Sequence, residues 1–163
     1  MKKLSIEEEE LLFKDLSSRL LYKVTCKCYH VESQEQDGKP FVATYDETLQ
    51  MMDADGLVFT DGFNYEIDEV RPYLRSLSSM TEEEKIRLYQ IAGFYYLSDF
   101  ELQKDEWKKF SDALSENKLF LPYPTGDNLI KIYDWLNKHD FDYRGLIEKG
   151  LAIEITEDNN PYK

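Results

Sequence analysis

Cysteine, glycine and histidine are scarce in this chain of 163 residues, which contains two cysteines, seven glycines and two histidines. Two cysteines cannot build the framework of bridges that stabilises small disulfide-rich domains. The sequence contains no G-x-G-x-x-G, Gly-Lys-Ser/Thr or G-x-S-x-G motif. It therefore lacks the loops with which many nucleotide-binding proteins hold phosphates, and the turn that carries the serine of many hydrolases.

Long hydrophobic runs are also absent. No stretch approaches the roughly 20 apolar residues of a membrane span, and MKKLSIEEEE at the start has no apolar run of signal-peptide length. We therefore expect a cytoplasmic protein without membrane association. Because 42% of the residues are hydrophobic, the chain can bury a core without help, and we expect no metal and no cofactor.

Basic residues are few relative to acidic ones, with 20 Lys and Arg against 33 Asp and Glu and a net charge of −13. The excess is spread along the chain: residues 1–80 hold 9 basic against 16 acidic residues, and residues 81–163 hold 11 against 17. A surface of this sign repels phosphates, so we expect no direct nucleic-acid binding. The same charge raises the alternative of an acidic decoy that occupies the nucleic-acid-binding site of another protein.

Residues 1–78 are expected to form a first subdomain of one helix and a small antiparallel sheet. Ser5 and Glu8 have the spacing of a capping box, and apolar residues three and four apart predict a helix over residues 6–20. From Tyr22 on, apolar residues alternate and are divided by three Asp-Gly pairs, which indicates four or five short strands with tight turns. This meander forms either a small SH3-like or Sm-like barrel or an open sheet covered by the helix.

Residues 79–163 are expected to form a helical second subdomain, so the fold class is α+β. Thr81 begins another capping box, and the apolar spacing that follows predicts three helices. Proline and glycine predict a loop over residues 121–127. The pattern also predicts a short helix over residues 143–149 and a frayed tail over residues 156–163.

Cys26, Cys28 and His30 form the most suggestive set of potential ligands. On a strand these three side chains face the same side, and they could form part of a zinc site with an acidic residue or His139 as the fourth ligand. Structural zinc sites usually take ligands from a C-x-x-C knuckle, which is absent, and strand residues two apart suit a disulfide poorly. We therefore favour a plain strand with free thiols.

Arg71, Tyr73 and Arg75 alternate along a segment that Pro72 marks as an edge strand or an extended closing segment. Leu74 would then point to the opposite side, into the core. Either the arginines balance neighbouring carboxylates across the sheet, or the strip is a binding edge, because Tyr and Arg dominate interface energetics. No catalytic residue is identified, and the candidate binding residues are Arg71, Tyr73, Arg75, Tyr143 and Arg144.

Three longer strings, LLFKDLSSRL, EVRPYLRSLSSMTEEE and DYRGLIEKGLAIE, together resemble a set of proteins from gut Bacteroidetes and from their phages or integrated elements. The strings cover about a quarter of the chain, which departs from the usual pattern at LLYKV and at Ser76. The resemblance implies a shared scaffold and a place in a mobile element. It implies no activity, because none is assigned to that set.

These observations favour a non-enzymatic interaction or accessory protein that acts by binding another protein. The sequence indicates neither the identity of that partner nor the oligomeric state. Two alternatives stay open, the acidic decoy and an enzyme whose site is assembled from scattered residues. Carboxylates clustered at phosphate-like spacing would favour the decoy, and a concave pocket with titratable groups would favour the enzyme.

Overall fold

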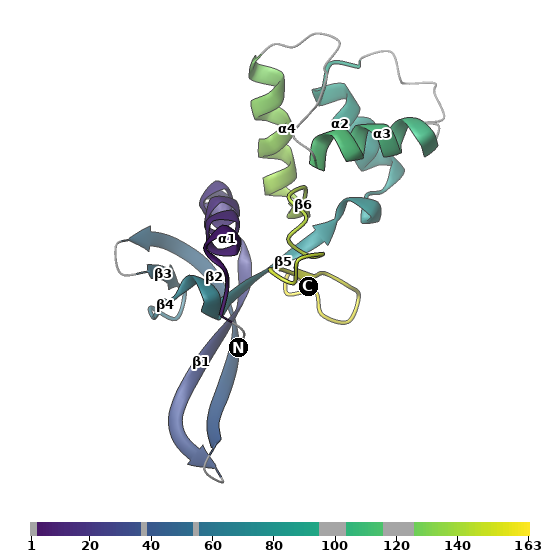
Figure 1. Cartoon of the computed structure of the whole chain (residues 1–163). Helices are drawn as coiled ribbons and strands as arrows, with labels where there is room; N and C mark the ends of the chain where they lie inside the picture. The colour runs from purple at the N-terminus through teal and green to yellow at the C-terminus, as the bar shows by residue number, and fades with distance from the viewer. Residues whose placement is uncertain (1–2, 37–38, 54–55, 95–103, 116–125) are drawn as a thin grey trace. The chain divides into compact units, whose positions relative to one another are not determined.

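The computed structural model describes residues 3–36, 39–53, 56–94, 104–115 and 126–163 (Figure 1). The fold is α+β, as the sequence predicts. The chain divides into two compact units, one formed by Met1–Leu74 with Leu146–Lys163 and the other by Arg75–Gly145. The Asp-Gly turn expected at residues 37–38 and most of the loop expected at residues 121–127 lie outside the described residues.

Helix α1 (Ile6–Arg19) begins at the predicted capping box. The Glu8 N–H donates to the Ser5 hydroxyl at 3.2 Å, and the Ser5 N–H donates to the Glu8 carboxylate at 2.8 Å. Three glutamates in the first turn suit the positive end of the helix dipole. Leu12 and Leu16 of the predicted apolar stripe are completely buried and pack on the sheet, whereas Phe13, which the same pattern includes, is 53% exposed.

The strands of the first unit are β1 (Thr25–Gln36), β2 (Lys39–Asp53), β3 (Gly56–Phe59), β4 (Asn64–Tyr65), β7 (Ile153–Glu154) and most of β5 (Val70–Ser76), whose last two residues belong to the second unit. Short helices η1 (Leu20–Tyr22) and η2 (Ile67–Glu69) lie between the strands. Antiparallel pairing gives the order β4-β3-β2-β1-β5. Strand β7 pairs with β5 in parallel, so the sheet is mixed. Within the described residues β4 and β5 do not pair with each other, and the sheet is therefore open.

Strand β5 closes the antiparallel order, as expected, but it is not a free edge. Residues 70–72 pair with β1, whereas Tyr73 and Leu74 pair with β7. The Ile155 N–H donates to the Leu74 carbonyl at 2.8 Å, and the Leu74 side chain is completely buried. Because β7 comes from a distant part of the chain, the local pattern around Pro72 does not indicate it.

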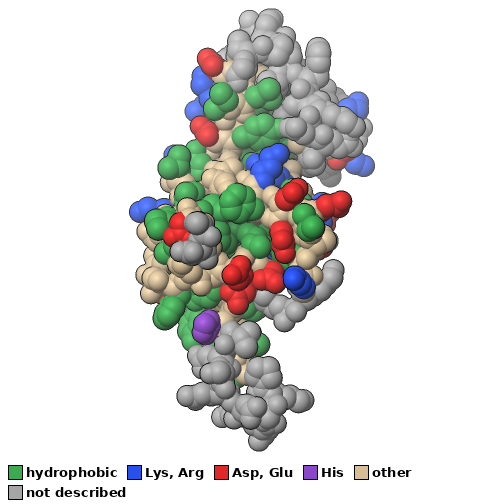
Figure 2. Space-filling model, turned by 60° about the vertical axis from the view of Figure 1, so that its left-hand side comes forward, with side chains coloured by type: hydrophobic (Ala, Val, Ile, Leu, Met, Phe, Trp, Pro, Cys, Tyr) green, Lys and Arg blue, Asp and Glu red, His purple; other side chains and the backbone are tan. Residues whose placement is uncertain are grey.

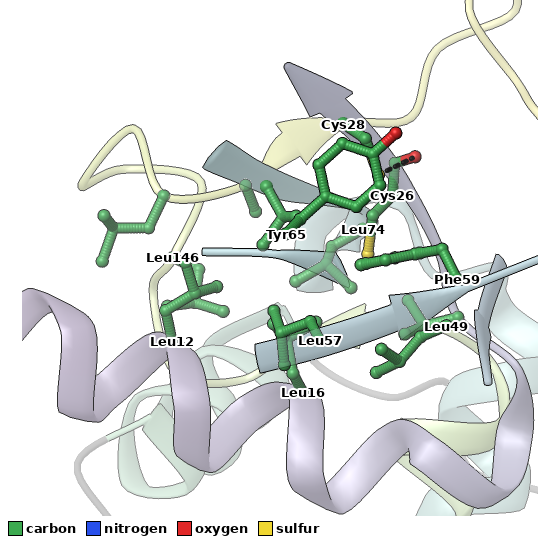
Figure 3. Packing of buried hydrophobic residues seen from close by; sticks show 14 of the residues in the cluster. Leu12, Leu16, Cys26, Cys28, Leu49, Leu57, Phe59, Tyr65, Leu74 and Leu146 are labelled. Carbon is green, nitrogen blue, oxygen red and sulfur yellow. Dashed lines mark hydrogen bonds between the residues drawn. The ribbon is translucent and has the colours of Figure 1, made fainter. Parts of the chain in front are cut away.

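The core of the first unit lies between α1 and one face of the sheet. Leu12 and Leu16 point from the helix towards Leu57 and Leu49 of the strands (Figure 3). Leu146 packs in the same cluster. Burying a leucine side chain contributes about 1.5–3 kcal/mol, so this layer of side chains attaches the helix to the sheet.

An ion pair is buried on α1 beside this core. The Arg19 Nε atom lies 2.7 Å from Asp15 Oδ2, and Nη2 lies 3.1 Å from Oδ1. Both side chains are 0% exposed. The two residues are one helical turn apart, and nothing in the apolar pattern of the sequence distinguishes them from a surface pair.

The second unit contains β6 (Phe141–Asp142), η3 (Leu77–Ser79) and the helices α2 (Glu82–Ile91), α3 (Lys104–Ser115) and α4 (Gly126–Lys138). The predicted capping box of Thr81 begins α2. Strand β6 pairs in parallel with Arg75 and Ser76, the last residues of β5. The helices pack around buried residues such as Leu88 and Ile132.

Two expectations near the C-terminus are wrong. None of the residues 143–149 is helical, and residues 146–150 form a turn that Gly150 ends, with φ of 69° and its N–H donating to the Ile147 carbonyl. The tail is not frayed, because the Tyr162 hydroxyl accepts a hydrogen bond from the Thr25 N–H of β1 at 3.1 Å. Both segments find partners that are distant in the sequence.

Candidate functional site

Arg71 of β5 is used inside the first unit. Its Nε donates to the carbonyl of Gly150 at 3.2 Å, and its Nη1 donates to the carbonyl of Asp68 at 3.1 Å. Burial lowers the pKa of its guanidinium. Arg71 therefore holds the turn at Gly150 against the start of β5.

Tyr73 is buried, with an exposed fraction of 3%, and does not form an exposed strip with the neighbouring arginines. Its hydroxyl donates to Asp46 Oδ1 at 2.8 Å. Lys27 Nζ lies 3.4 Å from the same carboxylate oxygen and 5.7 Å from the centre of the Tyr73 ring. The tyrosine thus connects three neighbouring strands of the sheet.

Arg75 makes its contacts inside the second unit. Its two terminal nitrogens donate to the two carboxylate oxygens of Glu84 at 2.7 and 2.9 Å. Its guanidinium carbon lies 4.2 Å from the centre of the Phe141 ring. Burial alone would raise the pKa of Glu84, but hydrogen bonds from Arg75 and Thr81 hold it below the ordinary value. This arginine therefore joins β5 to α2 and β6.

Tyr143 and Arg144 contact each other in the same unit. Tyr143 is buried, its hydroxyl donates to Asn137 Oδ1 at 3.0 Å, and the Arg144 guanidinium lies 4.4 Å from the centre of its ring. All five candidate binding residues thus make contacts within their own unit. These contacts differ from the expected charge balance across the sheet, because Arg71 donates to backbone carbonyls and Arg75 pairs with Glu84 of α2. A role for them in binding a partner stays a prediction.

A pocket of about 430 Å³ opens on the sheet of the first unit. It is lined by His30 of β1, Tyr45 and Glu47 of β2, Asp61 and Phe63 of the turn between β3 and β4, and Tyr65 of β4. Four of these six side chains carry aromatic rings and two are carboxylates. The sequence did not single out this set.

The pairing of β1 with β2 brings half of the pocket together. Cys26 lies opposite Glu47, Cys28 opposite Tyr45, and His30 two residues further along β1. Side chains two apart on a strand share a face. Tyr45, Glu47 and His30 therefore share the face on which the two cysteines are buried.

The turn between β3 and β4 supplies the other half. Asp61 and Gly62 form the predicted tight turn, in which Gly62 has φ of 80°. Asp61 Oδ1 accepts the Phe63 N–H at 2.9 Å, and Oδ2 accepts the Tyr65 hydroxyl at 2.7 Å. One carboxylate thus holds both aromatic residues of this half in position.

The rings of the pocket are arranged at an angle to one another. The centre of the His30 ring lies 6.3 Å from that of Phe63, with 32° between their planes, and 6.3 Å from that of Tyr65, with 83° between their planes. Phe63 is 63% exposed and Tyr45 is 44% exposed, whereas Tyr65 is buried. Figure 2 shows hydrophobic and acidic side chains exposed next to one another on one face of the molecule.

The pocket is electrostatically negative. Glu47 accepts a hydrogen bond from the Thr60 hydroxyl, and within the described residues no lysine or arginine lies within ion-pair distance of Glu47 or Asp61. Burial raises the pKa of the Cys28 thiol to about 12, and the charges of Asp61 and Glu47 add to this shift. Burial and Asp61 also raise the pKa of Tyr65.

The cysteines and the histidine of the suspected metal motif have different surroundings. Cys26 and Cys28 form no disulfide and are buried in the core, and His30 is exposed at the pocket. In the part of the chain that the structure describes, no group of three or more His, Cys, Asp or Glu could hold a metal ion. The alternation on β1 correctly predicted that these three side chains share one face of the strand. Along that face, however, the two cysteines are buried and His30 is exposed.

Comparison with protein-family profiles, curated proteins and solved structures finds no match for this chain. None of the described helices is long and apolar enough to cross a membrane. A function is therefore inferred from the pocket and its chemistry.

Proposed function

We propose that this protein is a non-enzymatic interaction protein that binds a partner protein at the pocket. The observation that supports the proposal is the exposure of Phe63 and Tyr45 beside two carboxylates that have no basic partner in the described residues. Exposed aromatic side chains that lie together mark binding surfaces, and aromatic residues contribute much of the energy of protein interfaces.

Binding fits the groups at the pocket better than covalent catalysis. A nucleophile must be ionised or held ready for ionisation near neutral pH. The raised pKa of Cys28 keeps this buried thiol protonated, and the raised pKa of Tyr65 does the same for the phenol. Neither group supplies an anionic nucleophile.

The acidic runs of the chain have local structural roles, so they give no specific support to a nucleic-acid decoy. Glu7, Glu8 and Glu9 occupy the first turn of α1, and the run at residues 82–84 occupies the first turn of α2. Acidic side chains at these positions stabilise a helix through its dipole and its free N–H groups.

The resemblance to proteins of Bacteroidetes phages and integrated elements supports a role as an accessory protein of a mobile element. Within this proposal, Arg71, Tyr73 and Arg75 position the strands and the helix around them. The partner contacts the pocket face, where the aromatic side chains remain accessible.

A comparison of two exposed-residue variants tests the proposal. Phe63 and Ile130 are both 63% exposed, but Ile130 belongs to α4 of the second unit. Tagged parent protein, Phe63→Ala and Ile130→Ala are each used to recover partners from cells of the source organism, and the bound proteins are identified by mass spectrometry. We expect Phe63→Ala to lose a protein that the parent and Ile130→Ala both retain. Identical sets of bound proteins for all three would contradict the proposal.

A further inference from the structure

We propose that the pocket accepts a cationic side chain, lysine or arginine, from the partner protein. This inference rests on the proposed function, because it specifies the chemistry that the same pocket recognises. The aliphatic part of the side chain would lie along the rings, and its charged end would reach Glu47 and Asp61. Three features of the pocket support this proposal.

The first feature is the arrangement of the rings. Phe63 and Tyr65 lie at the same 6.3 Å centre-to-centre distance from His30, one ring inclined by 32° and the other nearly perpendicular at 83°. Because the rings have different orientations, they can contact one bound lysine or arginine side chain from different sides. A cation within about 6 Å of an aromatic face gains roughly 0.5–1 kcal/mol at an exposed site.

The second feature is charge without a basic partner. Asp61 is held by the Phe63 N–H and the Tyr65 hydroxyl, and Glu47 by the Thr60 hydroxyl. These donors are neutral and occupy only some of the oxygen lone pairs, so each carboxylate can accept a further hydrogen bond from a cationic group. Elsewhere in the chain Asp15, Glu84 and Asp46 lie beside a basic side chain. At the pocket the described residues supply none, and a partner can do so.

The third feature is size. A volume of about 430 Å³ is at the lower end of the range for small-ligand pockets, roughly 300–1,000 Å³. A space of this size accommodates one long side chain with some water. Both lysine and arginine combine an apolar stem with a charged end, which matches a lining of aromatic walls and carboxylates.

Short peptides test this chemistry without knowledge of the partner. The probes are acetylated and amidated Gly-Lys-Gly, Gly-Arg-Gly, Gly-norleucine-Gly and Gly-Glu-Gly, titrated into the isotope-labelled full chain. Aromatic NMR signals of Phe63, Tyr45 and His30 report on binding. We expect the lysine or the arginine peptide to shift these signals, and the neutral and acidic peptides to leave them in place. The two cationic arms also show which charged group is preferred.

Variants separate charge from general surface effects. Glu47→Gln and Asp61→Asn keep side-chain shape, whereas Glu148→Gln removes the same charge from an exposed position outside the pocket lining. We expect each pocket variant to weaken binding of the cationic peptide by about two- to fivefold, which corresponds to roughly 0.5–1 kcal/mol. Glu148→Gln should bind like the parent. Raising the salt from about 50 mM to about 500 mM should weaken binding by the parent.

Thermal melting of each variant confirms that it is folded before it is titrated. If the norleucine peptide binds as well as the lysine and arginine peptides, the site is merely apolar and the inference is wrong. Absence of any shift with the cationic peptides at millimolar concentration would also overturn it. The proposed function would still stand if Phe63→Ala lost a specific partner in the recovery experiment, so the two failures are distinguishable.

Discussion

Removing the buried arginine of α1 is expected to destabilise the first unit strongly. The Arg19 guanidinium approaches Asp15 at 2.7 and 3.1 Å, and neither side chain is exposed. In Arg19→Met the new side chain fills part of the space, but the Asp15 carboxylate loses a charged partner while it remains buried. Breaking a buried pair in this way costs about 3–5 kcal/mol, a large part of the roughly 5–15 kcal/mol by which typical proteins are stable.

Removing both charges should cost much less. In the double variant Asp15→Leu with Arg19→Met, both charges of this pair are removed, and such replacements are often neutral or stabilising by about 1–4 kcal/mol. Glu10→Gln, at an exposed position of the same helix, is the matched control. Its effect should stay within about 0.5 kcal/mol, as is usual for surface changes.

The two units can be followed separately in a urea titration. Trp107 and Trp135 are the two tryptophans of the chain, and both belong to the second unit, so their fluorescence reports on that unit. Backbone NMR signals of α1 and β1 report on the first. The reasoning fails if Arg19→Met lowers the free energy of unfolding of the first unit by less than about 1 kcal/mol, or if the double variant is as unstable as the single one.

Four further substitutions have defined outcomes. Burial raises the pKa of the Cys28 thiol from its ordinary 9.0 to about 12. The unfolded chain therefore loses the thiol proton at a lower pH than the folded protein does, so the stability of the folded protein falls as the pH rises above about 9. Cys28→Ala should reduce this fall in stability. If the melting temperatures of the parent and of Cys28→Ala fall equally with rising pH, the prediction is wrong. Leu74→Ala, at a fully buried position, should cost about 2–5 kcal/mol in urea denaturation. Arg75 forms a partly exposed ion pair with Glu84, so Arg75→Ala should cost only about 1 kcal/mol. If Leu74→Ala and Arg75→Ala lose the same free energy of unfolding, the distinction between a core residue and a partly exposed ion pair is wrong. Gly56→Ala would place a Cβ atom 2.8 Å from the Tyr65 carbonyl at φ of +139°; it should destabilise the first unit and shift the Tyr65 NMR signals, and an unchanged spectrum would count against it.

Local motifs in the sequence predict the start of the described elements well. The capping boxes at Ser5 and Thr81 and the Asp61-Gly62 turn are present as expected. Each of these depends on atoms that are four residues apart or fewer, so a short window of sequence contains all the interacting groups.

Long-range pairing could not be predicted in the same way. The parallel partner of Leu74 is Glu154, and the tail residue Tyr162 accepts a hydrogen bond from Thr25. Nothing near β5 in the sequence indicates either contact. The same reason explains why Tyr73 was expected on an exposed strip: its hydroxyl donates to Asp46, on a strand that is not its neighbour in sequence.

Part of the pocket lining could be predicted from the sequence. Asp61, Phe63 and Tyr65 alternate from the turn into β4, and Tyr45 and Glu47 alternate on β2. Alternation alone places each group on one face of its own segment. That the two groups line the same pocket depends on strand register, which alternation does not determine.

The division of the chain into units has a consequence for biosynthesis. The first unit takes Leu146, Leu151 and β7 from a part of the chain that leaves the ribosome after residues 75–145. Domains generally fold as units once their residues are available. The sheet of the first unit therefore keeps part of its apolar surface uncovered until residues 146–163 have been synthesised. Residues 75–145 are continuous in sequence, so the second unit can fold earlier. During this interval the uncovered apolar face of the sheet is a surface to which chaperones that shield nascent chains can bind.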